Sequence, residues 1–240
     1  MGAIKQFISK LIPDSLMTRY VQYKRNRRWK NKSAEEVFSN IYHGKNWGGH
    51  QSVSGRGSDD DQTATIAAFI PEMITKLQAT SFLDIPCGDF HWMKNVNLAG
   101  AKYMGADIVP EIVANNKKQY ESERVTFQQL NLIEGPLPAA DIVFCRDCLV
   151  HFSYDHIRGA LKSIANSGAK YLATTSFNKR TSNNDIVTGN WRPLNLRVAP
   201  FNFPAPLIEF DEKCTEGENQ FADKTLSVWK VEDLKKMIAQ

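Results

Sequence analysis

Five short apolar runs, separated by longer segments of mixed polarity, constrain the fold of this 240-residue chain more than any other feature. Alternation of this kind is typical of a parallel sheet with helices on both faces. Two further runs, "PLIEFDE" and "KTLSVWKV", predict an antiparallel pair near the C-terminus. The predicted fold is an α/β doubly wound sheet of about seven strands, mostly parallel with an antiparallel C-terminal strand. We expect strands near 81–85, 102–107, 125–130, 140–145 and 169–175, and helices near 89–98, 109–120 and 154–166.

The first 58 residues follow a different pattern. "AEEVFSNIY" has helical spacing, and "WGGHQSVSGRGSDDD" is a long Gly- and Ser-rich loop of the kind that closes over a site as a lid. From Asp59 a second helical pattern begins, with Asp61 as the expected cap and Pro71 as a kink. We therefore divide the chain into residues 1–58, a basic amphipathic helical segment with a lid loop, and residues 59–240, the main domain.

Positive charge is concentrated at the N-terminus. Residues 1–32 hold nine Lys and Arg and one acid, a charge of +8, whereas the whole chain carries +4 and the remainder therefore carries −4. This distribution argues against a nucleic-acid-binding face on the main domain. The same segment has an apolar stripe that either lies on anionic lipid or a partner, or packs on the protein's own core. The stripe consists of Ile4, Phe7, Ile8, Leu11 and Ile12.

Membrane-spanning and metal-binding classes are not indicated. The chain has no run of about 18 apolar residues, and its N-terminus lacks the apolar core of a signal peptide. Cys145 and Cys148 form a CxxC, but no second CxxC or close His pair completes a zinc site. We expect no metal, and we predict a cytoplasmic protein whose basic segment either makes a peripheral membrane contact, binds a partner or packs on the protein's own core.

The run "LDIPCGDF" places an acid and a glycine at the carboxyl end of the first strand, where doubly wound sheets bind ligands. Gly88 lets ligand atoms approach the backbone, and Asp84 can accept hydrogen bonds. About 20 residues later, "YMGADIV" ends a strand in Asp107, where an acid accepts both hydroxyls of a ribose. Either acid alone is often a packing or surface residue, but together they predict a nucleoside-containing ligand.

At these residues the sequence resembles the class I S-adenosylmethionine-dependent methyltransferases, over about residues 62–175. "LDIPCGDF" resembles their first motif with fewer glycines, and "QLNLIEGPLP" and "ADIVFCRDCLVHFS" match the blocks after the third and fourth strands. The flanks "NIYHGKNWGGHQSVSGRGS", "GNWRPLNL" and "KTLSVWK" resemble a bacterial subgroup, some of whose members are linked to surface-sugar modification. The resemblance implies a Rossmann-like fold and S-adenosyl-L-methionine as cofactor. It implies cofactor contacts by Trp47, Ser54, Gly55, Asp84, Pro86, Gly88, Asp89, Phe90, Trp92, Asp107, Ile108, Asn131, Leu132 and Arg146.

Methyl transfer from a sulfonium to an oxygen needs positioning and, for a hydroxyl acceptor, a base. His151 is the expected general base because its ordinary pKa lies near neutrality; the alternative is a packing role on Phe152. Arg146 and Asp147 can orient the acceptor or pair with each other. Trp191, Arg192 and Asn195 can line an acceptor site or simply pack. The expected acceptor is a hydroxyl or carboxylate of a sugar, a glycan or another small molecule, and the sequence does not predict an oligomeric state.

Two other classes share this layered sheet. A nicotinamide-dependent reductase needs a Tyr-x-x-x-Lys pair downstream of the nucleotide turn, and the only such spacing, Tyr20 with Lys24, lies far upstream. A non-catalytic cofactor-binding or scaffold protein keeps the fold and loses the acceptor site. The segments "CRDCLVHFS" and "GNWRPLNL" favour an enzyme over a scaffold.

Overall fold

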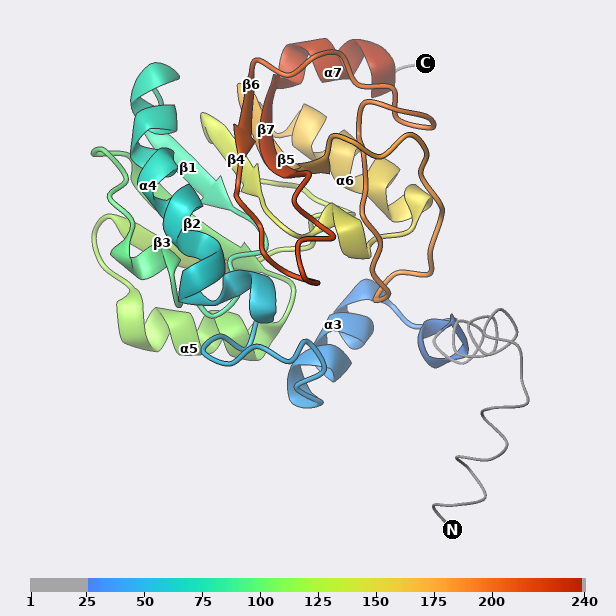
Figure 1. Ribbon diagram of the computed structural model, residues 1–240. Helices are drawn as coiled ribbons and strands as arrows, with labels where there is room; N and C mark the ends of the chain where they lie inside the picture. The colour runs from blue at the N-terminus through green and yellow to red at the C-terminus, as the bar shows by residue number, and fades with distance from the viewer. Residues whose placement is uncertain (1–25, 239–240) are drawn as a thin grey trace, which may run out of the picture.

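The structure, a computed structural model, describes the backbone of residues 26–238 and the side chains to residue 235. Its centre is a seven-stranded sheet with the order β3-β2-β1-β4-β5-β7-β6 (Figure 1). The predicted doubly wound sheet is therefore confirmed. The strands are β1 (Ser81–Asp84), β2 (Lys102–Asp107), β3 (Val125–Gln129), β4 (Ile142–Cys145), β5 (Tyr171–Phe177), β6 (Ile208–Asp211) and β7 (Lys224–Lys230).

Strand direction follows the prediction as well. β1 to β5 pair in parallel, and β7 pairs antiparallel with both β5 and β6. Only β7 therefore opposes the rest among these seven strands. Because of this reversal, the first residue of β7, Lys224, stands beside the last residue of β5, Phe177. A basic side chain thus reaches the edge of the sheet where the parallel strands end.

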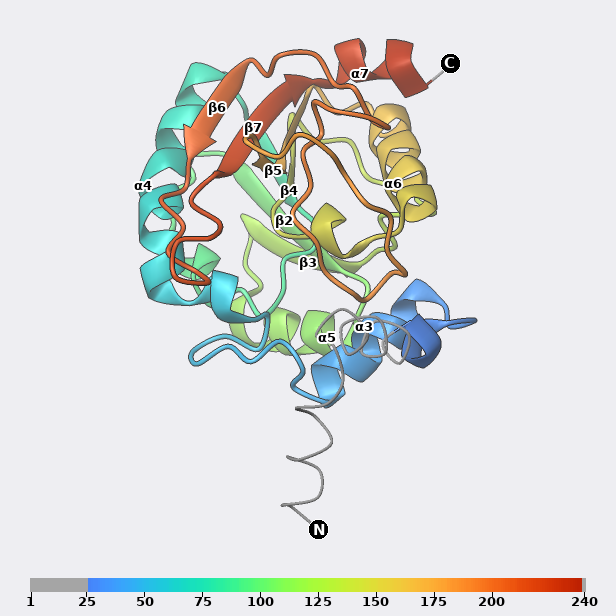
Figure 2. The ribbon, with the colours of Figure 1, turned by 45° about the vertical axis from the view of Figure 1, so that its right-hand side comes forward.

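Helices cover both faces of the sheet, and Figure 2 shows α4 and α6 on opposite sides of it. The helices are α3 (Ala34–His43), α4 (Asp60–Lys76), α5 (Pro110–Tyr120), α6 (Tyr154–Asn166) and α7 (Val231–Ile238). Ile66, Ile70 and Met73 of α4 pack in one buried cluster, whereas Ile157 and Leu161 of α6 pack in the other. Each side chain lies on the apolar stripe that an amphipathic helix presents to a core.

Local sequence explains where the helices begin. α3 has a capping box, in which Ser33 Oγ accepts from the Glu36 amide at 3.2 Å and Glu36 accepts from the Ser33 amide at 2.7 Å. α5 has Pro110 in its first turn, and Ser153 caps α6 through the amide of His156. The N-cap position of α4 is Asp59, whose side chain makes no capping hydrogen bond, and not the expected Asp61, whose carboxylate pairs with Arg56.

The helix expected at residues 89–98 is wrong. This segment contains only a short 3-10 turn, Met93–Asn95. Gly88 and Phe90 have φ angles of 54° and 59°, which a right-handed helix does not allow. Asp89, in addition, uses its carboxylate to hold Ser52 and Val53 of the preceding loop. Residues 89–98 therefore form a turn. Only the length and the composition of the segment resemble those of a helix. The helix α4, by contrast, continues through Pro71.

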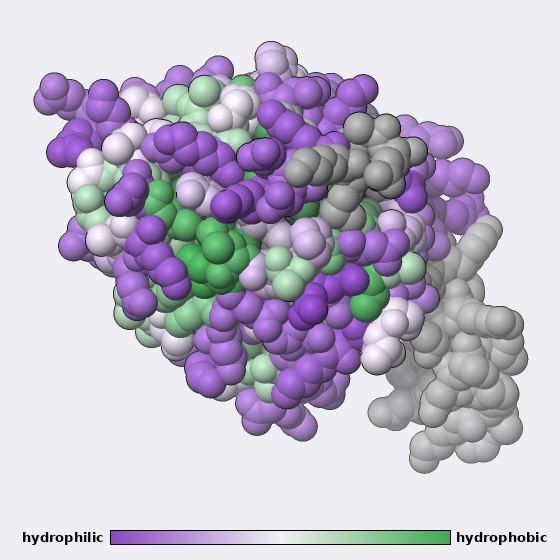
Figure 3. Space-filling view, turned by 90° about the horizontal axis from the view of Figure 1, so that it is seen from above, coloured by the Kyte–Doolittle hydropathy of each residue, from purple (hydrophilic) through white to green (hydrophobic). Residues whose placement is uncertain are grey.

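The N-terminal segment is described from residue 26 onward. Trp29 and the α3 residues Val37, Phe38 and Ile41 are buried in the same cluster as α6. The apolar stripe predicted at residues 4–12 lies outside the described residues. No helix within residues 26–238 has the length and hydrophobicity that crossing a bilayer requires. Seen from above, the surface is largely hydrophilic around a hydrophobic area (Figure 3).

The strand order places the crevice. From β1 the chain moves outward to β2 and β3, and then returns to β4 on the other side of β1. The connections after β1 and β4 consequently leave the sheet in opposite directions. A crevice opens at such a switch point, outside the carboxyl ends of the strands. Asp84 ends β1 and Arg146 follows β4 at this edge.

Candidate active site

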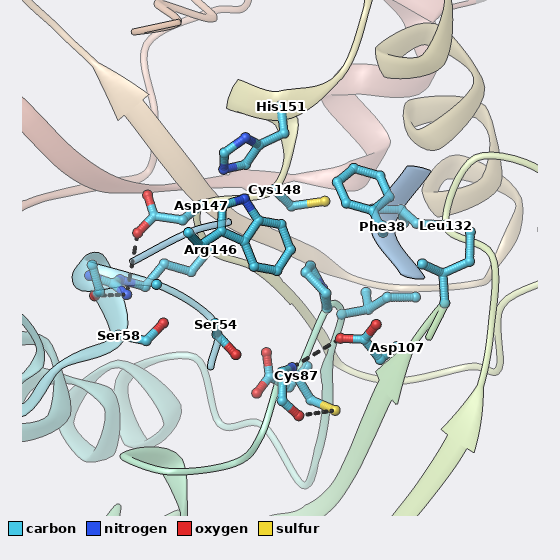
Figure 4. Close-up of a pocket in the computed structure, with 18 of the residues that line it drawn as sticks. Phe38, Ser54, Ser58, Cys87, Asp107, Leu132, Arg146, Asp147, Cys148 and His151 are labelled. Atoms are coloured by element: carbon cyan, nitrogen blue, oxygen red, sulfur yellow. Dashed lines mark hydrogen bonds and ion pairs between the residues drawn. The ribbon is translucent and has the colours of Figure 1, made fainter. Parts of the chain in front are cut away.

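A cavity of about 480 Å³ lies at this edge, and its wall is mostly apolar. Residues that end or follow β1, β2, β3, β4 and β5 line it, together with the loop before α4 and the start of β7. Figure 4 shows Asp107 and Cys87 at one end, and Asp147 and His151 at the other. Following the roles expected from the sequence, we name the first the cofactor end and the second the acceptor end. A cavity of this size holds one nucleoside-sized ligand and a second small group.

At the cofactor end, Gly88 and Asp107 form one hydrogen-bonded unit. The Gly88 amide donates to Asp107 Oδ2 at 3.1 Å, and the Val109 amide donates to Oδ1 at 3.0 Å. A Cβ at Gly88 would collide with Ser54 Oγ, so only glycine fits this turn. Burial raises the pKa of Asp107 to about 6, against the opposing effect of these amides. The unit leaves carboxylate lone pairs for further donors.

Asp84 is buried beside this unit. The Tyr103 hydroxyl donates to Asp84 Oδ2 at 2.7 Å. Burial raises the pKa of Asp84 to about 7, although the Tyr103 hydrogen bond opposes the change. Among the described residues, no Lys or Arg nitrogen lies within 4 Å of either Asp84 or Asp107 as an ion-pair partner. The cofactor end therefore holds two carboxyl groups that lack a protein counter-ion.

The loop before α4 covers this end. The carboxylate of Asp59 accepts from the amides of His50, Gln51 and Ser52 at 2.9 to 3.3 Å, and from Arg56 at 2.9 Å. Burial opposes ionisation of Asp59, but these donors outweigh it and lower its pKa. Asp89 holds the other side of the loop. The predicted lid is thus fixed against the β1 turn, with Trp47, Ser54 and Gly55 facing the cavity.

At the acceptor end, three buried charged groups and the partly buried Asp147 neutralise one another. Arg146 donates through Nε and Nη2 to Glu212 Oε2 at 3.0 and 2.8 Å. Lys224 Nζ lies 2.6 Å from Asp147 Oδ2 and 3.5 Å from Glu212 Oε2. Burial would raise the pKa of Asp147, but Lys224 and Arg146 lower it to about 2. Asp147 is therefore ionised at all ordinary pH values and fixed in position.

His151 also faces this end of the cavity. Its Nδ1 lies 3.0 Å from the carbonyl oxygen of Asn190. A carbonyl oxygen only accepts, so Nδ1 carries the proton and Nε2 keeps a lone pair. Burial lowers the pKa of His151, and the Asn190 carbonyl only partly opposes that effect. The ring, packed 5.8 Å from that of Trp47, is neutral and able to accept a proton.

Most of the predicted site residues do line the cavity, and three do not. Phe90 packs in the core against Tyr103 and Phe127, with ring centroids 5.0 and 5.1 Å away. Arg192 and Asn195 are buried in the chain segment behind the site. The residues that line the cavity are Trp47, Ser54, Gly55, Asp84, Pro86, Gly88, Asp89, Trp92, Asp107, Ile108, Asn131, Leu132, Arg146, Asp147, His151 and Trp191.

Arg192 and Asn195 do not contact the acceptor space, because backbone carbonyls occupy their donors. The Arg192 guanidinium donates to the carbonyls of Leu149, Val150 and Phe152 at 2.9 to 3.0 Å. It therefore holds the turn that carries His151. Asn195 donates to the Arg180 carbonyl at 2.7 Å and accepts from the Arg197 amide at 2.9 Å.

Sequence analysis missed several residues of the acceptor end. Lys224 and Glu212 lie in or beside strands that the sequence did predict, but nothing local indicates that they face Asp147 and Arg146. Phe177, Glu216 and Phe221 also line the cavity. The aromatic residues Trp191 and Phe221 meet only after the segments around β5 and β7 come together. No three His, Cys, Asp or Glu side chains in the described part are arranged to hold a metal ion.

Comparisons with known proteins agree with this geometry. Residues 82–168 match a family model described as "Methyltransferase domain". The match covers about a third of the chain. Such a domain uses S-adenosyl-L-methionine as its cofactor. No curated protein sequence matches the chain at a significant level.

Solved structures of low sequence identity share the fold. Human N-acetylserotonin methyltransferase in complex with S-adenosylmethionine is 15% identical, with a TM-score of 0.58 over 83% of this chain and 60% of that one. This chain thus spans less than two thirds of that enzyme's length. Magnesium protoporphyrin IX methyltransferase from Synechocystis PCC 6803 is 13% identical, with a TM-score of 0.56 over 83% of this chain and 97% of that one. At these identities the likeness extends to the fold alone.

The residues of the cofactor end fit S-adenosyl-L-methionine. Gly88 lines the cavity without a side chain, and Ser54 of the covering loop packs directly against its backbone. Asp107 keeps both oxygens at the edge of the cavity and can accept the paired hydroxyls of a ribose. The cofactor carries a net positive charge, and the carboxyl groups of Asp84 and Asp107 have no protein cation beside them to compete with it. The cavity therefore fits the cofactor that the match to a methyltransferase domain implies.

Proposed function

We propose that the protein transfers a methyl group from S-adenosyl-L-methionine to an oxygen, a hydroxyl or a carboxylate, of a small acceptor, with sugars and glycans as the favoured class. One observation supports oxygen as the methylated atom. His151 is held as a neutral base by the Asn190 carbonyl, with Nε2 free at the end of the cavity opposite Asp107. A neutral imidazole beside a cofactor-sized space is what a hydroxyl acceptor requires.

The cofactor roles follow from position in the cavity. In this proposal Asp107 receives the ribose hydroxyls, and Ile108, Asn131 and Leu132 surround the adenine. Asp84, Pro86, Gly88, Asp89 and Trp92 form the turn against the methionyl part, closed from above by Trp47, Ser54 and Gly55 and from the side by Arg146. All of these side chains line the same cavity.

The chemistry asks for position, exclusion of water and one proton transfer. When bound, the cofactor supplies a methyl group activated by its sulfonium. The residues of the acceptor end would hold the acceptor oxygen in line with that methyl group. His151 Nε2 takes the proton that the acceptor hydroxyl releases. Asp147 and Arg146 hold the acceptor end in a single arrangement, which favours the in-line geometry of attack.

The cellular setting is part of the proposal. We place the protein in the cytoplasm, with a peripheral membrane contact through the basic residues 1–32, which would suit a lipid-linked acceptor. Residues 1–25, which carry most of that segment, lie outside the described residues. We retain the division into residues 1–58 and the main domain 59–240, and we expect no nucleic acid as partner.

S-adenosylhomocysteine binding tests the cofactor assignment. At about 100 times its dissociation constant it should add roughly 2.7 kcal/mol to the free energy of unfolding, which a thermal-shift measurement detects. NAD should give no shift. Asp107→Ala should weaken the shift while keeping the fold, and Glu123→Ala, an exposed acid elsewhere, should not. Stabilisation by NAD in place of S-adenosylhomocysteine would reject the proposal.

A further inference from the structure

Three aromatic rings form one wall of the acceptor end. The ring centroids of Trp191 and Phe221 are 4.8 Å apart, and Phe177 lies 6.0 Å from Trp191 and 6.1 Å from Phe221, all in edge-to-face contacts. Trp191 is 42% exposed, an unusual state for a large aromatic side chain. All three line the cavity. Edge-to-face packing leaves ring faces and edges available for a ligand.

Every Arg and Lys that lines the described cavity already has an acidic partner. Arg56 pairs with Asp59 and Asp61. Arg146 pairs with Glu212 and, at 3.4 Å, with Asp147. Lys224 pairs with both Asp147 and Glu212. An anionic ligand at this end would therefore have no unpaired Arg or Lys to bind. His151 offers none either, because its pKa is lowered and its ring is neutral.

Glu216 is the exception among the acids of this end. It lines the cavity, and no Lys, Arg or His of the described chain lies within the 4 Å of an ion pair. The surroundings of Gly57 show where the Glu216 carboxylate lies. An added Cβ there would lie 3.0 Å from Asp147 Oδ2, 3.4 Å from Glu216 Oε2 and 3.7 Å from Lys224 Nζ. Glu216 Oε2 also accepts a weak hydrogen bond from Cys214 Sγ at 3.7 Å. Glu216 therefore stands beside the Asp147 that we place at the reacting end, with lone pairs available for donors.

The acceptor end thus carries one negative charge more than positive. Asp147 and Glu212 balance Arg146 and Lys224, and Glu216 adds the excess. The positive charge of the cofactor does not neutralise this excess, because the carboxyl groups of Asp84 and Asp107 lie at the cofactor's own end of the cavity. A carboxylate receives hydroxyl donors well and repels a second anion.

We propose that Glu216, with the aromatic wall of Phe177, Trp191 and Phe221, forms an acceptor subsite for a hydroxyl-rich group without negative charge, such as a neutral sugar ring. Glu216 accepts hydrogen bonds from its hydroxyls, and the wall covers its apolar face. This inference rests on the proposed function and narrows it. The methylated group is a hydroxyl and not a carboxylate, because a carboxylate acceptor would bring its charge next to Asp147 and Glu216.

A matched pair of probes tests the subsite. The full chain is saturated with S-adenosylhomocysteine and titrated calorimetrically with methyl glucopyranoside and with the corresponding methyl glucuronoside, whose carboxylate is ionised at pH 7.5. We expect the neutral glycoside to bind at least about tenfold more tightly than the anion, a difference of about 1.4 kcal/mol. Glu216→Gln should shrink this ratio, because it removes the charge and keeps the shape. Phe221→Ala should weaken both glycosides alike.

Glu218→Gln is the control, since Glu218 lies exposed on the same loop and outside the cavity, and it should leave the ratio unchanged. The inference is overturned if the anion binds as tightly as the neutral glycoside or more tightly. It is also overturned if Glu216→Gln keeps the wild-type ratio, or if neither glycoside binds at roughly 100 mM. Saturation with S-adenosylhomocysteine is measured first. A chain that does not bind it fails the proposed function, whereas intact cofactor binding without this selectivity fails the subsite alone.

Discussion

The cofactor end and the acceptor end of the cavity stabilise their buried carboxylates by different means. Asp84 and Asp107 receive hydrogen bonds from a hydroxyl and from backbone amides, and burial raises their pKa values to about 7 and about 6. Asp147 has Lys224 and Arg146 beside it, and its pKa falls to about 2. The carboxyl groups of the cofactor end therefore have no cationic partner in the protein. The carboxylates of the acceptor end, Asp147 and Glu212, have theirs without any ligand.

The two ends should consequently respond to pH in opposite directions. The pKa values of Asp84 and Asp107 are raised in the folded state, so their contribution to stability is full below about pH 4 and is lost as the pH rises through 6 to 7. The pKa of Asp147 is lowered, so its contribution is present above about pH 4 and is lost as the pH falls toward 2. A cationic ligand at the cofactor end would offset the loss there.

The largest effect is expected from His151→Ala. Removal of the base should lower turnover by roughly 100- to 10,000-fold with a hydroxyl acceptor, and leave the affinity for S-adenosylhomocysteine unchanged. Asp107→Ala should do the reverse, which would separate the two ends functionally. His43→Ala, at an exposed histidine, is the control for turnover. Near-normal turnover in His151→Ala would indicate that the acceptor needs no base or that another group supplies it.

Lys224→Met tests the neutralised end through stability. The change leaves Asp147 and Glu212 with Arg146 as the only cation of this buried set, and breaking a buried pair typically costs about 3 to 5 kcal/mol. Urea unfolding at pH 7 measures the loss. Lys230→Met, at the exposed last residue of the same strand, should cost far less. Equal costs for the two variants would mean that the buried network does not stabilise the acceptor end.

Asp84→Asn tests the cofactor end by the same measurement. The amide keeps an oxygen for the Tyr103 hydroxyl but cannot ionise, so the variant should lose only the share of stability that Asp107 contributes between pH 5 and 8. At pH 8 it should gain on the order of 1 to 3 kcal/mol relative to its deficit at pH 5, since each pKa unit is worth about 1.4 kcal/mol. Asp147→Asn should show no such gain, because it leaves Lys224 without its nearest partner.

The same contrast explains how much of the molecule its sequence predicts. The cofactor end is built from short contiguous stretches, in which a strand ends in an acid and turns at once on a glycine. "LDIPCGDF" and the end of β2 therefore predict Asp84, Gly88 and Asp107 correctly as neighbours across one cavity. The sheet itself is predicted for the same reason, since each strand appears as its own apolar run.

The acceptor end depends on contacts between distant positions. Lys224 meets Asp147 across 77 positions, and Arg146 meets Glu212 across 66. Nothing in the sequence indicates that Lys224 or Glu216 lies beside Asp147. The sequence left open whether Arg192 lines the acceptor site or packs, and the structure shows that three backbone carbonyls accept hydrogen bonds from its guanidinium. The turn at 89–98 was predicted as a helix because positive φ angles leave no mark on polarity.

Arg192→Gln should give the smallest effect, one that concerns position and not contact. Arg192 holds the carbonyls of Leu149, Val150 and Phe152, and its charge contributes to lowering the pKa of His151. Without it, the turn should loosen and the pKa of His151 should rise, so that a higher pH is needed to keep Nε2 unprotonated. The acidic limb of the pH–rate profile should therefore shift to higher pH, with turnover at neutral pH reduced by about tenfold or less.

Arg192→Lys keeps the charge but cannot reach three carbonyls, so turnover should fall while the limb stays in place. The affinity for S-adenosylhomocysteine serves as the control for both variants, because the cofactor end contains no contact to Arg192. An Arg192→Gln variant that loses turnover without any shift of the acidic limb would show that Arg192 only supports the fold and has no electrostatic effect on the base.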